Sequence, residues 1–117
     1  MARDPRAFLW DAREAAKAIA SFADGRTLQE YEADIMLRSA VERQFEIVGE
    51  ALNQLAKASP DLAAQVVDLP RIVAFRNILI HAYAAIDNAI VWRVVQENVP
   101  ALIATLDRLL AGNGGSA

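Results

Sequence analysis

The chain has 117 residues, of which 55 % are hydrophobic, and its formal net charge at pH 7 is −3. This length fits one domain, and the apolar content is sufficient for a core without disulfide bonds. The chain has no cysteine and only one histidine, which excludes thiolate and multi-histidine metal sites within a single copy. The negative charge excludes a general attraction to nucleic acid, so any contact with RNA must come from a local cluster of basic residues.

Charged residues interrupt every long apolar stretch. Asp11, Arg13 and Glu14 break the apolar segment near the N-terminus, which excludes the pattern of a secretory signal. The longest uncharged candidate for a membrane span, residues 77–86, has about half of the roughly 20 residues that a span requires. We therefore expect a soluble, cytoplasmic protein with no membrane partner.

The first predicted helix starts near Asp4, which is suited to the N-cap, with Pro5 at the first helical position. Apolar residues recur at helical spacing from there to Ala20. We expect Asp24-Gly25 to end this helix, because glycine readily adopts the left-handed conformation found just after a helix.

A second, long helix is expected from the capping box formed by Thr27 and Glu30 to about Lys57. Gly49 in its interior costs about 1 kcal/mol relative to alanine, which predicts a close crossing by another helix. Glu46 and Glu50 lie roughly 150° from the apolar stripe of this helix. They form either a solvated face or, in the case of Glu50, a contact that orients Arg76 or His81.

Three further helical segments complete the chain. Residues 59–61 should end the long helix and start a short piece over residues 62–67. A helix is then expected from residue 71 to about 83 or 84. Asp87 starts a final pattern, which Pro100 should kink or interrupt.

These elements predict an all-α fold, a compact bundle of four or five helices. We expect a single helical domain over residues 1–111 and a flexible tail over residues 112–117. The apolar fraction is high for so small a helical domain, so part of the surface is expected to form a dimer interface.

The only histidine lies in the motif Arg76-Asn77-Ile78-Leu79-Ile80-His81-Ala82-Tyr83. An imidazole can act as general base and general acid, and a guanidinium can hold a phosphate and stabilise its developing charge. Together they are sufficient to cleave an RNA phosphodiester without a metal.

The helical period limits what one copy of the motif can do. On a straight helix Arg76 and His81 diverge by roughly 140°, whereas Arg76 and Tyr83 lie only about 20° apart. Arg76 and His81 can therefore reach one phosphate only if the helix ends near His81 or if two copies meet across a two-fold axis. We favour the second arrangement, because it would also cover apolar surface.

Each residue of the motif also has a structural interpretation. His81 could cap the C-terminus of its helix, and Arg76 could form an ion pair with a glutamate of the long helix. Tyr83 could pack with its hydroxyl in water.

The complete motif and its helical context resemble the HepT-like toxins of the HEPN ribonuclease superfamily. The signature of this family is an arginine, a polar residue, three further residues, a histidine, any residue and a tyrosine. The segments 45–52, 69–70 and 99–102 are also similar to the family, so the resemblance covers about residues 5 to 110.

This resemblance implies an HEPN-like bundle and a metal-independent endoribonuclease that acts as the toxin of a type VII-like toxin–antitoxin system. Arg76 and His81 would be the catalytic pair, Asn77 would position them or the phosphate, and no metal or cofactor is implied. Such proteins form homodimers whose two motifs line a shared cleft. Their partner is an MNT-type nucleotidyltransferase antitoxin, which transfers AMP to the motif tyrosine, here Tyr83.

An alternative is a catalytically inactive helical module that binds a nucleotide or a nucleotidyltransferase. Arg76 and Asn77 would then hold a phosphate without cleaving RNA. A carboxylate-bridged di-metal bundle is excluded, because it requires a glutamate three residues before a histidine and this position is Ile78.

Overall fold

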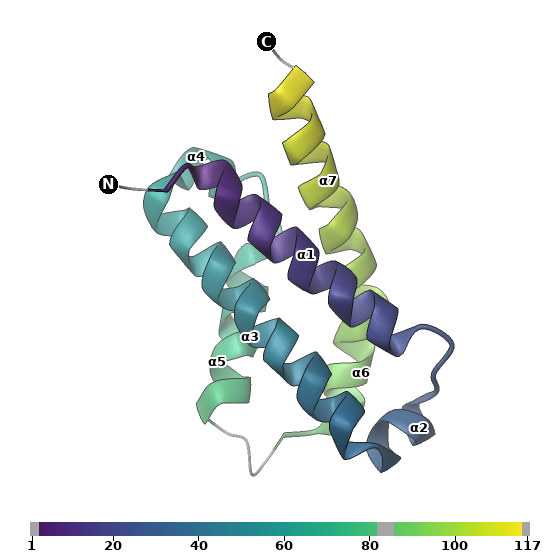
Figure 1. The fold of residues 1–117 in the computed structure, drawn as a ribbon. Coiled ribbons are helices and arrows are strands. Elements are labelled where there is room, and N and C mark those ends of the chain that lie inside the picture. The colour runs from purple at the N-terminus through teal and green to yellow at the C-terminus, as the bar shows by residue number, and fades with distance from the viewer. Residues whose placement is uncertain (1–2, 82–85, 116–117) are drawn as a thin grey trace.

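The computed structural model describes residues 3–81 and 86–115. Within these residues every regular element is a helix, five of them long and two short (Figure 1). Their bounds are α1 Pro5–Ala23, α2 Leu28–Ala33, α3 Ile35–Ala58, α4 Pro60–Ala63, α5 Leu69–His81, α6 Asn88–Glu97 and α7 Val99–Gly115. The all-α bundle predicted from the sequence is therefore confirmed.

The longest helix, α3, lies at the centre of the bundle. It packs against α1 along much of its length and against α5, while α1 also contacts α7 and α2 contacts α6 (Figure 1). The core between these helices is apolar, and its largest fully buried side chains include Leu9, Phe45, Leu52, Ile72 and Leu106. Burial of this apolar surface is what holds α5, and with it Arg76, against α3.

The predicted signals at the two ends of α1 are confirmed. The side chain of Asp4 accepts a hydrogen bond from the backbone N–H of Arg6, and Pro5 is the first helical residue. Gly25 follows the helix with φ of 73°, the left-handed conformation that its lack of a side chain permits. The capping box of Thr27 and Glu30 has both of its reciprocal hydrogen bonds.

The prediction of one continuous helix from residue 28 to about Lys57 was wrong. The chain breaks at Asp34, whose backbone is extended and whose side chain accepts a hydrogen bond from Leu37 N–H, so that it caps α3. An aspartate competes for backbone N–H groups in this way. Next to the break, Tyr31 is fully buried and packs against Trp92 of α6, with 5.1 Å between ring centroids and 36° between ring planes.

Smaller differences occur after α3. The short helix α4 begins at Pro60 and ends at Ala63, rather than covering residues 62–67, because Ser59 caps it. Helix α5 starts at Leu69 rather than residue 71 and ends at His81; its expected end at residue 83 or 84 lies outside the described residues.

The predicted helix start at Asp87 and the predicted interruption near Pro100 are both confirmed. Asp87 caps α6, and the chain is interrupted before Pro100, between Glu97 and Val99. Helix α7 continues to Gly115, and the flexibility of segment 112–117 stays a prediction. No described helix combines the length and the apolar character needed to cross a membrane.

One carboxyl near α2 makes stability depend on pH. Burial raises the pKa of Glu42, Arg38 lowers it in part, and the negative charge of Glu46 raises it further. A raised pKa means that the folded protein disfavours the ionised carboxylate, so stability is lost as pH rises through the window above the ordinary glutamate pKa. We expect Glu42→Gln to be more stable than the parent at pH 7, by a margin that disappears below about pH 4. Urea unfolding at several pH values measures this, and a margin independent of pH would contradict it.

Candidate active site on helix α5

Helix α5 crosses α3 at very short range where Gly49 has no side chain. A Cβ atom built on Gly49 would lie only 2.5 Å from Cγ of Arg76, far inside ordinary van der Waals contact. The close helix crossing predicted from this glycine is therefore confirmed. The aliphatic stem of Arg76 occupies the space that a side chain at position 49 would need.

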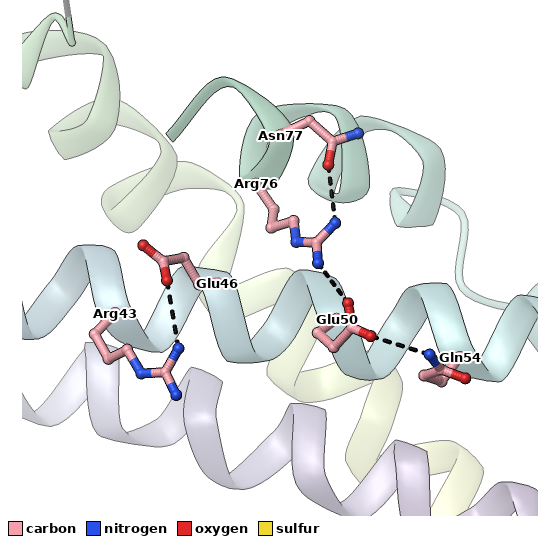
Figure 2. Close-up of polar contacts among 6 residues, drawn as sticks. All are labelled: Arg43, Glu46, Glu50, Gln54, Arg76 and Asn77. Carbon is pink, nitrogen blue, oxygen red and sulfur yellow. Dashed lines mark hydrogen bonds and ion pairs between the residues drawn. The ribbon is translucent and has the colours of Figure 1, made fainter. Parts of the chain in front are cut away.

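A chain of polar contacts holds the guanidinium of Arg76 (Figure 2). Its Nη2 donates to Oε2 of Glu50, and its Nη1 donates to Oδ1 of Asn77 at 2.9 Å. Gln54 Nε2 in turn donates to the other oxygen of Glu50 at 3.0 Å. Arg76 is thus the ion-pair partner of a glutamate on the long helix, and Glu50 faces the motif rather than only solvent.

Glu46 and Glu50, whose roles the sequence did not decide, have different partners. Glu50 contacts Arg76, whereas Glu46 forms an ion pair with Arg43 on its own helix, at 3.3 Å between Nη1 and Oε1 (Figure 2). The Arg43 side chain is 68 % exposed, so this second pair is a surface contact of small energetic value. Only Glu50 has a direct role in placing a motif residue.

The Arg76 guanidinium is well fixed and only partly shielded. Its side chain is 21 % exposed, and its Nε has no hydrogen-bond partner within the described part of the chain. An arginine has five N–H donors in a rigid fork, and two of its nitrogens already donate to Glu50 and Asn77. The fork is therefore held in one orientation. Because Nε is buried, the donors left for an anion that approaches from solvent are the second N–H groups of Nη1 and Nη2.

His81 lies on a different face of α5. It is the last residue of the helix and is exposed, as is Asn77 one turn earlier. Arg76 and Ile80, four residues apart, both line a groove to which His81 does not contribute. Within the described residues, Arg76 lines this groove and His81 does not, which agrees with the divergence expected from the helical angles. Tyr83 lies outside the described residues.

The groove is an open cavity of about 550 Å³ between α1, α3 and α5. Its walls include Phe8 and Trp10 of α1, Arg43 and Glu50 of α3, and Arg76 and Ile80 of α5. Sequence reasoning missed the α1 wall, because nothing in the local pattern of α1 indicates which helix it faces. One signal in the sequence could have pointed to this wall, namely the large aromatic residue Trp10 in a helix whose buried residues are mainly alanines.

Comparison with known proteins identifies the family. The family described as ribonuclease HepT-like matches residues 12–109. A Methanocaldococcus jannaschii protein named "Putative RNase MJ1380" is 37 % identical over 100 residues, which cover 84 % of this chain and 89 % of that protein. A Thermococcus cleftensis protein named "Probable ribonuclease HepT" is 28 % identical over 109 residues, covering 93 % and 98 %.

No solved structure shows a significant match to the chain. The family match nevertheless spans five of the seven helices of the described residues completely, α2 to α6, which include α3 and the motif helix α5. The ribonuclease class expected from the motif is also the class by which the family is described. The chain belongs to the HepT-like ribonuclease family.

Proposed function

We propose that this protein is a metal-independent endoribonuclease whose catalytic residues are Arg76 and His81. Ribonuclease activity is supported by the family and by the names of the relatives. The observation that carries the assignment of residues is the Arg76 guanidinium, which Glu50 and Asn77 hold at the edge of an open groove. A preoriented cation of this kind stabilises charge that develops on a phosphate in the transition state.

The reaction needs one base, one acid and one cation. The His81 imidazole takes the proton of a ribose 2′-hydroxyl, and the 2′-oxygen then attacks the adjacent phosphorus. The bond from phosphorus to the 5′-oxygen breaks, and that oxygen leaves with a proton from the imidazolium or from water. Arg76 binds the non-bridging oxygens, and Asn77 keeps its guanidinium in place. The products are a 2′,3′-cyclic phosphate and a free 5′-hydroxyl.

We propose further that the active form is a homodimer with the site at the two-fold interface. Four exposed residues share one face of α5, and they are Ala74, Asn77, Ile78 and His81. Ile78, at one edge of this face, is 55 % exposed, and a second copy of α5 would cover it. Such a contact lets His81 of one protomer approach Arg76 of the other, which the angle between them prevents within one straight helix.

Purified protein should cleave RNA in the presence of EDTA, and the products should carry 2′,3′-cyclic phosphate ends. His81→Ala should reduce cleavage by about 10²- to 10⁴-fold, the range for loss of a general acid–base group. Because His81 is exposed at a helix end, the variant should keep the circular dichroism spectrum and unfolding midpoint of the parent. Cleavage by a well-folded His81→Ala protein at the parent rate would overturn the assignment.

We also propose the toxin role in a type VII-like toxin–antitoxin pair, with an MNT-type nucleotidyltransferase as antitoxin and Tyr83 as the acceptor of AMP. Anionic phosphates added close to Arg76 would compete with RNA for its guanidinium. Incubation with the cognate transferase and ATP should add mass in AMP steps and lower cleavage. A Tyr83→Phe protein that gains the same mass would exclude Tyr83 as the acceptor.

The second candidate function is a nucleotide-binding module without catalytic activity. The net charge of −3 favours it, because such a chain has no general attraction for a long polyanion such as RNA. Saturable nucleotide binding by a folded dimer that leaves RNA intact in EDTA would select this function.

A further inference from the structure

The groove beside Arg76 has the size and lining of a small-molecule site. Its volume of about 550 Å³ falls within the roughly 300–1,000 Å³ typical of ligand pockets. Arg76 and Ile80 form one wall, and Trp10 lies on the opposite wall, contributed by α1. A nucleotide whose phosphate binds Arg76 would therefore have its base or its sugar at the entrance to this groove.

Trp10 is the aromatic surface that this groove offers. Phe8 also lines the groove, but the guanidinium of Arg3 lies over its ring at 4.9 Å from the centroid. Trp10 is 51 % exposed, an unusual state for so large an apolar side chain in a helix that buries its other face. An exposed indole in the same groove as an arginine proposed to bind phosphate is the combination that single-stranded RNA sites use to stack a base.

The charges of the groove argue against a path for the RNA backbone. Its carboxylates are Asp11, Glu14, Glu46 and Glu50, and they outnumber its guanidiniums, which are Arg3, Arg43 and Arg76. Each of these arginines is already paired with one of the carboxylates. A second phosphate would be repelled here, whereas an uncharged base would not.

The same carboxylates favour bases that carry an amino group. An ionised carboxylate only accepts hydrogen bonds and has about four acceptor positions, so each paired carboxylate keeps capacity for a further donor. Adenine, cytosine and guanine present an exocyclic amine on their pairing edge, and uracil does not. Gln54 and Gln44, which also line the groove, can donate to ring nitrogens or to a base carbonyl.

We propose that the groove between α1, α3 and α5 is a nucleobase subsite, in which Trp10 stacks the base of the nucleotide whose phosphate binds Arg76, with a preference for amino-bearing bases. This inference rests on the proposed function and adds its substrate specificity. Trp10 contacts the base only, so its loss weakens substrate binding and leaves the chemical step at Arg76 and His81 in place.

Tryptophan fluorescence of the full chain tests binding without requiring cleavage. The chain has two tryptophans. Trp92 packs against Tyr31 and does not line the groove, so it serves as an internal control. Titration with CMP should quench the fluorescence saturably, and the quench should be lost in Trp10→Phe and kept in Trp92→Phe. UMP should need several-fold higher concentration than CMP.

RNA cleavage supplies the second readout. Trp10→Ala should raise KM about 5- to 100-fold, the range for loss of one stacking contact, with kcat nearly unchanged. Phe22→Ala is the matched control, because Phe22 is an exposed aromatic of the same helix (38 % exposed) that does not line the groove, and its KM should equal that of the parent.

Four results would overturn the subsite. They are a quench that survives Trp10→Phe, equal affinity for UMP and CMP, a KM unaffected by Trp10→Ala, and a Trp10→Ala protein that changes from dimer to monomer, which would make the groove a subunit contact. The fluorescence titrations with CMP and UMP test the subsite even if the protein cleaves no RNA. Conversely, cleavage with an unchanged KM in Trp10→Ala rejects the subsite and leaves the proposed ribonuclease intact.

Discussion

An equal mixture of Arg76→Ala and His81→Ala proteins is expected to cleave RNA, although neither protein does so alone. If each site combines Arg76 of one protomer with His81 of the other, a mixed dimer has one site with both residues and one site with neither. Random exchange of subunits makes half of the dimers mixed, so about a quarter of the parent activity should return. Each single variant should lose at least about 10²-fold in kcat.

The experiment needs proof that subunits have exchanged. The two variants can be co-expressed with different affinity tags and purified through both, which isolates the mixed dimer and raises the expected recovery to about half. A mixture of Arg76→Ala with itself under two tags is the matched control and should stay inactive. A purified mixed dimer without activity would place Arg76 and His81 of one site in the same protomer, and the chain beyond the end of α5 would then have to redirect the imidazole.

Gly49→Ala should destabilise the protein by up to about 2 kcal/mol, although alanine is the better helix former. The substitution gains about 1 kcal/mol of helix propensity, but the added methyl would lie 2.5 Å from Cγ of Arg76. Overpacking of this kind typically costs about 1–3 kcal/mol. Relief requires α5 to move away from α3, because the blocking atoms belong to the stem of Arg76 close to its backbone. Gly49→Val should cost more.

The same movement should reduce cleavage, since it draws Arg76 away from Glu50. Gly112→Ala is the control, because Gly112 is also helical and a Cβ there meets nothing within 4 Å. That variant should be as stable as the parent or more stable by up to about 1 kcal/mol, with unchanged activity. Urea unfolding and initial cleavage rates measure both variants. Equal stability of the two alanine variants would show that α3 and α5 can separate at no cost.

Local signals in the sequence predicted most of the helix ends. Asp4, Thr27 and Asp87 each cap a helix through a side chain and backbone groups two or three residues away, so the whole interaction can be read within a short window. Asp34 uses the same chemistry but lies inside a pattern that could continue as a helix. The break accompanies the packing of the buried Tyr31 against Trp92, a contact between residues far apart in the sequence.

Some features of the candidate site likewise follow from the sequence pattern, and others depend on tertiary packing. The divergence of Arg76 and His81 follows from the helical period alone, and the crossing at Gly49 follows from the cost of a glycine within a helix. The choice of Glu50 over Glu46 as the partner of Arg76 does not, because the two glutamates differ by one helical turn and only the position of α5 decides between them. Trp10 likewise lines the groove because of tertiary packing, which the residues next to it in the sequence do not indicate.

The ion pair of Glu50 and Arg76 has a kinetic consequence. A nuclease with an unpaired cationic surface collects RNA from a distance, whereas here the carboxylate cancels the charge of the guanidinium before any substrate arrives. At physiological ionic strength, fields also decay over a Debye length of about 8 Å. This ion pair therefore contributes little electrostatic steering of RNA, and in the proposed subsite the substrate is selected after collision, by contact within the groove.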